Sequence, residues 1–185
     1  MASEHELSDF LKSVERRAFK RCLYHVRDEE AALDIVQESM IKLAQHYGDK
    51  PLAELHLLFQ RILTHCMHDW FRRQKTRRAL FSNLSEFETP DDSDALDFLP
   101  DTLEAEGSES VQDSVERAQV LQLLENLIKE LPERQREAFL MRYWEEMDVA
   151  ETAAVMGCSE GSVKTHCFRA VQALSKALRA RGFSP

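Results

Sequence analysis

Residues that break helices are scarce in this chain. Its 185 residues include only five glycines and five prolines. Alanine, leucine, glutamate, arginine and glutamine, which favour helix, are abundant instead. No stretch shows the apolar–polar alternation of a half-buried strand, and no internal repeat is present. The sequence therefore predicts an all-α fold.

Long apolar runs are also absent. No stretch approaches the roughly 18 apolar residues that a helix needs to cross a bilayer. The first six residues, Met1 to Glu6, are polar and acidic, which does not fit a signal peptide. We therefore expect a soluble, cytoplasmic protein with no membrane insertion.

The patterns of catalytic and metal sites are missing as well. Four cysteines form no Cys-x-x-Cys pair, and each falls on or beside an apolar helical face: Cys22, Cys66, Cys158 and Cys167. This favours buried free thiols over disulfides or zinc ligands. There is no glycine-rich phosphate loop, no His-Glu-x-x-His run and no nucleophile beside a plausible base. We expect a protein that is not an enzyme and that uses no cofactor and no metal.

The net charge of −9 is unevenly distributed. Residues 80–114 contain eleven of the 33 acidic residues and no lysine or arginine, so the rest of the chain has 22 acidic against 24 basic side chains. This segment also contains Pro90, Pro100 and Gly107 and has no sustained helical period. We interpret it as a flexible acidic linker that hides the slightly basic character of both ends.

The linker divides the chain into two expected helical domains, residues 1–79 and 115–185. In the first, Ser3 and Glu6 form a candidate capping box for a helix that runs to about Val26. A second helix follows from about Glu29 and is broken by the segment 48–51. A third helix is expected near 52–63, and a fourth carries Asp69–Arg73. The second domain is expected to begin with a helix from about Ser114 to Pro132, followed by one over 134–143.

The segment Ala153–Val163, within residues 146–170, has the spacing of a DNA-binding helix-turn-helix. Ala153 permits a close helix crossing, Gly157 can adopt the positive φ of a sharp turn, and Val163 can anchor the second helix. Asp148 and Ser159 are candidate N-caps. Apolar residues continue along one side of the second helix, and Lys164, Thr165, Phe168 and Arg169 share the other, which suits phosphates and base edges. An ordinary helical hairpin with a solvated basic face is the alternative.

Two further clusters lie in the first domain. Asp34, Gln37, Glu38 and Ile41 share one helical stripe, which is either a partner-binding face or simply a solvated acidic one. The second cluster places five basic residues within 72–78, directly after Trp70 and Phe71. Cations beside aromatic rings suit single-stranded DNA, although cations also favour a helix C-terminus. His65, Cys66 and His68 lack a fourth ligand at useful spacing, so they do not predict a metal site.

Together, these clusters resemble the extracytoplasmic-function (group IV) sigma factors of the sigma-70 family. Asp34-Ile-Val-Gln-Glu38 is similar to the family's Asp-Leu-Val-Gln-Glu motif, and Arg61-Ile followed by Asp69-Trp-x-Arg-Arg73 to its promoter-melting segment. Leu131-Pro132, Arg136, Phe139, Gly157, Gly161-Ser-Val-Lys164 and Arg169-Ala170 are similar to its second domain. The resemblance covers nearly all of the chain outside the linker.

The resemblance implies a role for each cluster. Core polymerase, through its β′ clamp coiled coil, would be bound by Asp34, Gln37, Glu38 and Ile41. The −10 element would be bound by His65, Asp69, Trp70, Arg72, Arg73 and Lys75, with His65 at the start of a loop that captures a flipped base. The −35 element would be bound by Ser162, Lys164, Thr165, His166, Phe168 and Arg169. Further implied partners are the β subunit, promoter DNA and an anti-sigma factor.

Some residues depart from the family pattern. His65 replaces a common asparagine and Leu58 a common tryptophan. Thr152 replaces a common isoleucine, so its hydroxyl needs a hydrogen bond if it is buried. Glu160 brings an anion to the first turn of the DNA-binding helix, where it suits the helix dipole but repels phosphate. These changes concern which promoter is chosen rather than the class of protein.

Two other functions remain open from the sequence. A stand-alone helix-turn-helix regulator predicts operator binding without polymerase and a two-fold symmetric footprint. A helical interaction protein predicts no salt-dependent affinity for DNA. The linker length also permits either a compact or an open arrangement of the two domains.

Overall fold

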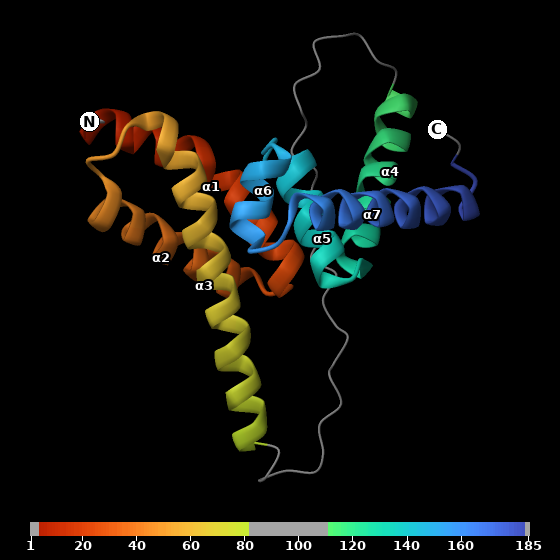
Figure 1. Cartoon of the computed structure of the whole chain (residues 1–185). Coiled ribbons are helices and arrows are strands. Elements are labelled where there is room, and N and C mark those ends of the chain that lie inside the picture. Colours follow the sequence, from red (N-terminus) through yellow and green to blue (C-terminus); the bar gives the residue numbers. More distant parts are fainter. Residues whose placement is uncertain (1–3, 82–110, 184–185) are drawn as a thin grey trace.

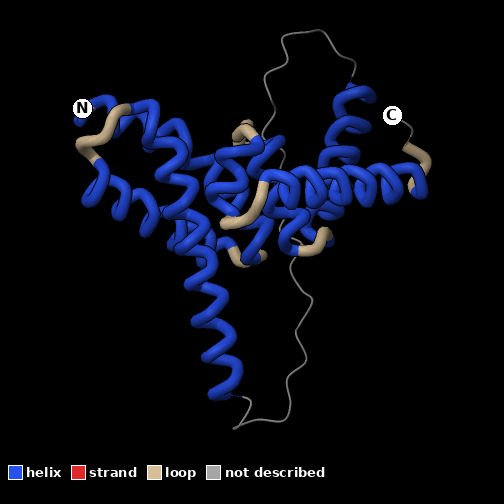
Figure 2. Tube along the Cα trace, in the orientation of Figure 1, coloured by secondary structure: helices blue, strands red, loops and turns tan. Residues whose placement is uncertain are grey.

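Every regular element in the described parts of the chain is a helix. The computed structural model describes residues 4–81 and 111–183, and no strand occurs in these two ranges (Figure 1; Figure 2). The all-α prediction is therefore confirmed. The capping box at Ser3 and most of the acidic segment 80–114 lie outside the described residues.

The N-terminal group of helices comprises α1 (Glu4–Val26), α2 (Glu29–Tyr47) and α3 (Leu52–Phe81). The helix α2 starts where expected, because the Asp28 carboxylate accepts a hydrogen bond from the Ala31 backbone N–H at 2.9 Å. It ends before the break at 48–51. The three helices enclose one core, which includes Ala18, Val36, Leu43, Leu55, Phe59 and Leu63.

The expectation of two separate helices after Pro51 was wrong. Residues 52–81 contain neither glycine nor proline, so nothing in the sequence stops the helix, and α3 continues for 30 residues. His65 consequently lies in the middle of a helix and not at the start of a loop. The C-terminal half of α3 projects away from the other helices (Figure 1).

The C-terminal group comprises α4 (Val111–Glu130), α5 (Glu133–Phe139), α6 (Val149–Met156) and α7 (Glu160–Ala180). The helix expected over 134–143 is present, but its last part, η1 (Leu140–Trp144), is a π-helical turn. In this turn the Glu145 N–H donates to the Leu140 carbonyl at 3.0 Å. This wider winding was not expected from the sequence, and it often occurs near functional sites.

The helix-turn-helix prediction is confirmed in detail. Asp148 and Glu151 form a reciprocal capping box at the start of α6, with N–H to carboxylate distances of 2.7 and 2.9 Å. Gly157 has φ +63°, and the Ser159 hydroxyl accepts from the Ser162 N–H at 3.1 Å. The departure at residue 152 is also accommodated, because the buried Thr152 hydroxyl donates to the Asp148 carbonyl at 2.7 Å.

The two groups of helices pack against each other. We call this contact the junction: α3 lies against α6, and α1 lies against α4 and η1. Across it, Arg136 Nη1 donates to the Tyr24 carbonyl at 2.8 Å, and Trp144 Nε1 donates to the Arg17 carbonyl at 3.2 Å. The sequence allowed compact and open arrangements, and this structure has the compact one.

Candidate nucleic-acid and partner interfaces

One face of α2 is exposed and partly apolar. Ile35, Val36 and Leu43 are buried in the core, whereas Asp34, Gln37 and Ile41 point to solvent, with Ile41 55% exposed. Leu33, which the sequence analysis did not single out, is 44% exposed beside them. Exposed aliphatic side chains among carboxylates are typical of a surface that a partner covers.

Glu38 lies at the edge of this face and is half-buried. Its carboxylate is 2.7 Å from Lys42 Nζ. The hydrogen bond from Lys42 to Glu38 raises the pKa of Lys42. Of the four residues expected at the partner-binding face, Glu38 is therefore the one with a cationic partner among the described residues.

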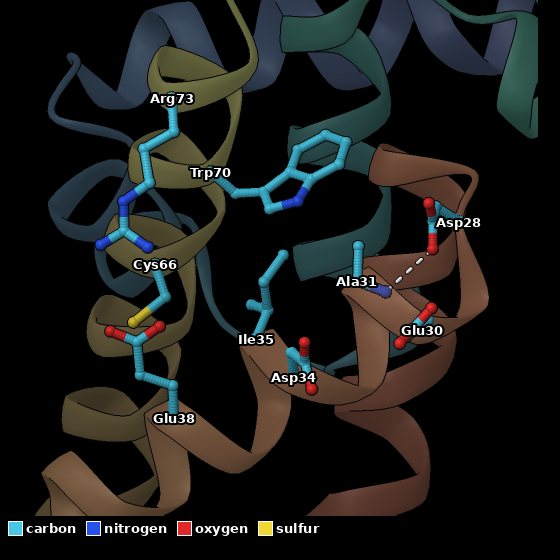
Figure 3. Close-up of a pocket in the computed structure, with 9 residues that line it drawn as sticks. All are labelled: Asp28, Glu30, Ala31, Asp34, Ile35, Glu38, Cys66, Trp70 and Arg73. Carbon is cyan, nitrogen blue, oxygen red and sulfur yellow. Dashed lines mark hydrogen bonds between the residues drawn. The ribbon is translucent and has the colours of Figure 1, made fainter. Parts of the chain in front are cut away.

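A cavity of about 300 Å³ joins the acidic face of α2 to α3. Figure 3 shows Asp34 and Glu38 on one wall and Trp70 and Arg73 on the other. Cys66 lies between Glu38 and Arg73 (Figure 3). The structure thus brings the two N-terminal clusters side by side. A molecule bound to the exposed face of α2 would therefore lie next to a molecule bound to α3.

The C-terminal half of α3 carries the basic and aromatic cluster. The Trp70 and Phe71 rings meet edge to face with centroids 5.0 Å apart, and Phe71 is 37% exposed. Arg72, Arg73 and Lys75 are all exposed, and Arg72 Nη2 also lies 2.8 Å from the Asp69 carboxylate. His65 is also exposed, on the same helix. Cations and rings along one projecting helix are suited to a single nucleic-acid strand.

The outer face of α7 presents the side chains expected to contact DNA. Lys164, Thr165, Phe168 and Arg169 are exposed, and Phe168 is 62% exposed. The opposite face is buried and consists of Val163, Cys167, Ala170 and Leu174. The remaining two residues of the expected set, Ser162 and His166, are half-buried. The Ser162 hydroxyl lies 2.9 Å from the hydroxyl of the N-cap Ser159.

Two residues of this surface escaped the sequence analysis. Arg142 and Tyr143 of η1 line a cavity of about 320 Å³ together with Lys164 and Phe168. Tyr143 is 58% exposed, and Arg142 donates a hydrogen bond to the Met147 carbonyl. The sequence of this segment mixes charged and apolar residues, so nothing in it marks this pair as part of a surface. The π-turn moves this pair beside the outer face of α7, which enlarges the candidate DNA surface.

Metal-binding clusters and membrane-spanning helices are absent from the described residues. They contain no cluster of His, Cys, Asp or Glu that could hold a metal ion. No helix among them is long and apolar enough to cross a bilayer. Three of the four free cysteines are buried, and Cys158 is half-buried. Burial raises the pKa of Cys22 to about 12, which keeps this thiol protonated and unreactive at neutral pH.

Comparisons with known proteins identify the family. The family model described as sigma-70, region 4, matches residues 121–174. The RNA polymerase sigma-E factor of Streptomyces antibioticus is 32% identical over 162 residues, which cover 84% of this chain and 75% of that protein. The ECF RNA polymerase sigma factor SigX of Bacillus subtilis is 28% identical over 155 residues, or 83% of this chain and 73% of SigX. The chain belongs to the extracytoplasmic-function sigma factor family.

A solved structure supports the fold of this sigma factor. The complex of the sigma factor RpoE with the anti-sigma factor NepR from Bartonella quintana matches with a TM-score of 0.59 and 20% identity, covering 95% of this chain and 96% of that one. Sigma factors are non-enzymatic transcription initiation factors, so the family favours this function over a stand-alone regulator or a helical interaction protein.

Proposed function

We propose that this sigma factor directs core RNA polymerase to specific promoters by using one group of helices for polymerase and the −10 element and the other for the −35 element. The corresponding domains are residues 1–79 and 115–185, joined by the acidic segment. The cytoplasm is the compartment in which such a factor meets polymerase and DNA. The observation that carries the proposal is that three separate candidate surfaces, on α2, α3 and α7, are exposed in one chain of this family.

The α2 face is proposed to bind core polymerase at the β′ coiled coil, with the β subunit as a second contact of the factor. Exposed Asp34, Gln37 and Ile41, with Leu33 at their edge, combine charge with apolar area. In an interface, the apolar side chains favour burial against the partner, and the charged side chains orient the two surfaces. Because α2 and α3 share a cavity, docking on α2 places polymerase beside the DNA-binding part of α3.

The α3 surface is proposed to hold the opened −10 strand. Each base that stacks on an aromatic side chain contributes roughly 1–3 kcal/mol. Separating a duplex costs about 1.4 kcal/mol per stacking step. Two or three captured bases therefore offset the first steps of melting without ATP. Trp70 and Phe71 offer the rings, and Arg72, Arg73 and Lys75 offer cations for phosphates.

The α7 surface is proposed to bind the −35 element in the major groove. Lys164 and Arg169 suit phosphates and guanine edges, and the exposed Phe168 ring suits a thymine methyl group. Arg142 and Tyr143 would add contacts at the side of the groove. We further propose that an anti-sigma factor covers these surfaces when the factor is inactive. The related Bartonella protein was crystallised with an anti-sigma factor.

Run-off transcription with purified core polymerase and a genomic promoter library tests this function. The double variant Lys164→Ala/Arg169→Ala is expected to reduce −35-dependent transcription about tenfold or more, since each specific contact is worth roughly 1–3 kcal/mol. Binding to core polymerase is expected to stay unchanged. The control is Lys176→Ala/Arg179→Ala, which removes the same charge from exposed positions farther along α7. Equal loss of transcription and polymerase binding would contradict the assignment of α7.

A further inference from the structure

Each group of helices has a core of its own. The buried cluster around Phe59 and Leu63 is formed entirely by α1, α2 and α3. The cluster around Met141 and Val163 belongs to the C-terminal group, with only Leu57 of α3 at its edge. Tyr24 is the one buried N-terminal residue in the third cluster. Among the described residues, opening the junction therefore separates few members of these apolar clusters and unfolds neither core.

The contacts that do cross the junction are largely polar. Glu137 and Glu145 in the C-terminal group are 2% and 3% exposed. Their carboxylates face two histidines of α3: Glu137 Oε1 is 3.8 Å from His68 Nε2, and Glu145 Oε2 is 3.8 Å from His56 Nε2. Both distances exceed that of a hydrogen bond. In the part of the chain that the structure describes, the only tighter partner of these carboxylates is Arg134, at 2.9 Å from Glu137 and in the same group of helices.

Polar groups at the junction are incompletely paired. Glu145 Oε1 and Arg136 Nε are buried and have no hydrogen-bond partner among the described residues. Water would satisfy both atoms once the junction opened. A contact that buries charge, leaves it partly unpaired and adds little apolar area is suited to release rather than to permanent assembly.

His68 connects the junction to the α3 surface. It lies on α3 three residues after His65 and one residue before Asp69, within the segment proposed to hold the −10 strand. In this arrangement the Glu137 carboxylate occupies the space beside His68. A DNA strand that follows α3 brings phosphates toward the same carboxylate, and like charges repel strongly in a partly buried setting.

We propose that the junction is a latch, which holds the free sigma factor closed through Glu137 and Glu145 against α3 and which single-stranded DNA on α3 releases. The proposal rests on the proposed function of α3. Its consequence is that DNA binding and separation of the two groups of helices are coupled. The apparent affinity of α3 for a strand is lowered in proportion to the small fraction of open molecules.

The first experiment measures the shape of the full chain in the absence of polymerase and DNA. The variant His56→Glu places a second carboxylate opposite Glu145, and small-angle X-ray scattering is expected to show a larger radius of gyration than for wild type. The control His46→Glu makes the same change of charge at an exposed position of α2 away from the junction. It is expected to scatter like wild type.

An unchanged radius of gyration for His56→Glu, with unchanged helical circular dichroism, overturns the latch. If His56→Glu loses helix, His68→Glu replaces it in this experiment.

The second experiment measures binding of a fluorescent 12-mer of deoxythymidine at low salt. His56→Glu is expected to bind at least threefold more tightly than wild type, because more molecules are open. The added negative charge alone predicts weaker binding, so the sign separates the two explanations. Saturating oligonucleotide is also expected to expand the wild-type chain. Tighter binding without expansion, or expansion of His56→Glu with no gain in affinity, overturns release by DNA. If neither protein binds the oligonucleotide, the proposed role of α3 fails as well, whereas the scattering of His56→Glu still decides whether a latch exists.

Discussion

At the scale of single residues, His25 connects stability to pH. This α1 side chain is buried, and burial lowers its pKa, with the nearby charges of Arg21, Arg136 and His68 lowering the pKa further. The folded chain therefore holds His25 neutral, whereas the unfolded chain protonates it below about pH 6.5. The resulting stabilisation is full above that pH and is lost as the pH falls toward the lowered pKa.

Urea unfolding at pH 7.5 and at pH 5.5 tests this linkage. The free energy of unfolding of the wild type is expected to be lower at pH 5.5. His25→Phe keeps a ring of similar size, and His25 Nε2 has no hydrogen-bond partner to lose among the described residues. This variant is expected to show a smaller difference between the two pH values. The exposed His46→Phe serves as control and should keep the wild-type difference. An identical pH dependence in His25→Phe would show that other groups carry the effect.

At the scale of elements, the turn between α6 and α7 depends on one backbone conformation. Gly157 has φ +63°, and a Cβ added there would meet no atom within 4 Å. Gly157→Ala therefore tests backbone strain without a clash. It is expected to lower the free energy of unfolding by about 1–2 kcal/mol.

Gly161→Ala is the matched control in the first turn of α7, where an added Cβ is 3.9 Å from the Ser159 hydroxyl. Since alanine favours helix more than glycine, this variant is expected to be neutral or stabilising by roughly 0.5–1 kcal/mol. Chemical denaturation of both variants under the same conditions provides the comparison. Equal destabilisation by the two substitutions would mean that loss of glycine as such, and not the left-handed turn, causes the effect.

Some elements could be predicted from local sequence signals, and others could not. Local signals were sufficient for the helix-turn-helix, because Asp148, Gly157 and Ser159 each act through atoms only a few residues away. Two helices were expected where α3 is continuous, although no helix breaker lies within it, and the loop position of His65 was implied by the family resemblance alone. The π-turn at η1 has no comparable local signature, because it depends on how residues 140–147 pack. Arg142 and Tyr143 were therefore missed.

The junction lay beyond sequence analysis for a different reason. His56 and His68 meet Glu145 and Glu137 across 89 and 69 residues of chain, respectively. No periodicity or motif relates such distant positions. Each side chain taken alone resembles an ordinary polar residue on a helix. Only the packing of the two groups reveals that these carboxylates are buried.

At the scale of the whole molecule, the covalent connection between the two groups of helices decides whether a weak junction is closed. Because α3 and α4 belong to one chain, association of the two groups is intramolecular, and a covalent connection can give an effective concentration of roughly millimolar. A junction too weak to hold separated groups together would thus still be closed in the intact chain. Weak association is expected for a polar contact between separately cored units.

Two fragments, residues 1–81 and 111–185, test this balance. Each is expected to unfold cooperatively, because the clusters around Phe59 and around Met141 are almost wholly contained in one fragment. Mixed at 10 μM, the fragments are expected to sediment separately in analytical ultracentrifugation, while the intact chain sediments as a compact particle. Association of the fragments at that concentration would show that the junction is strong enough to be permanent. Failure of either fragment to fold would show instead that the two groups form one cooperative unit, which would refute the proposed division into domains.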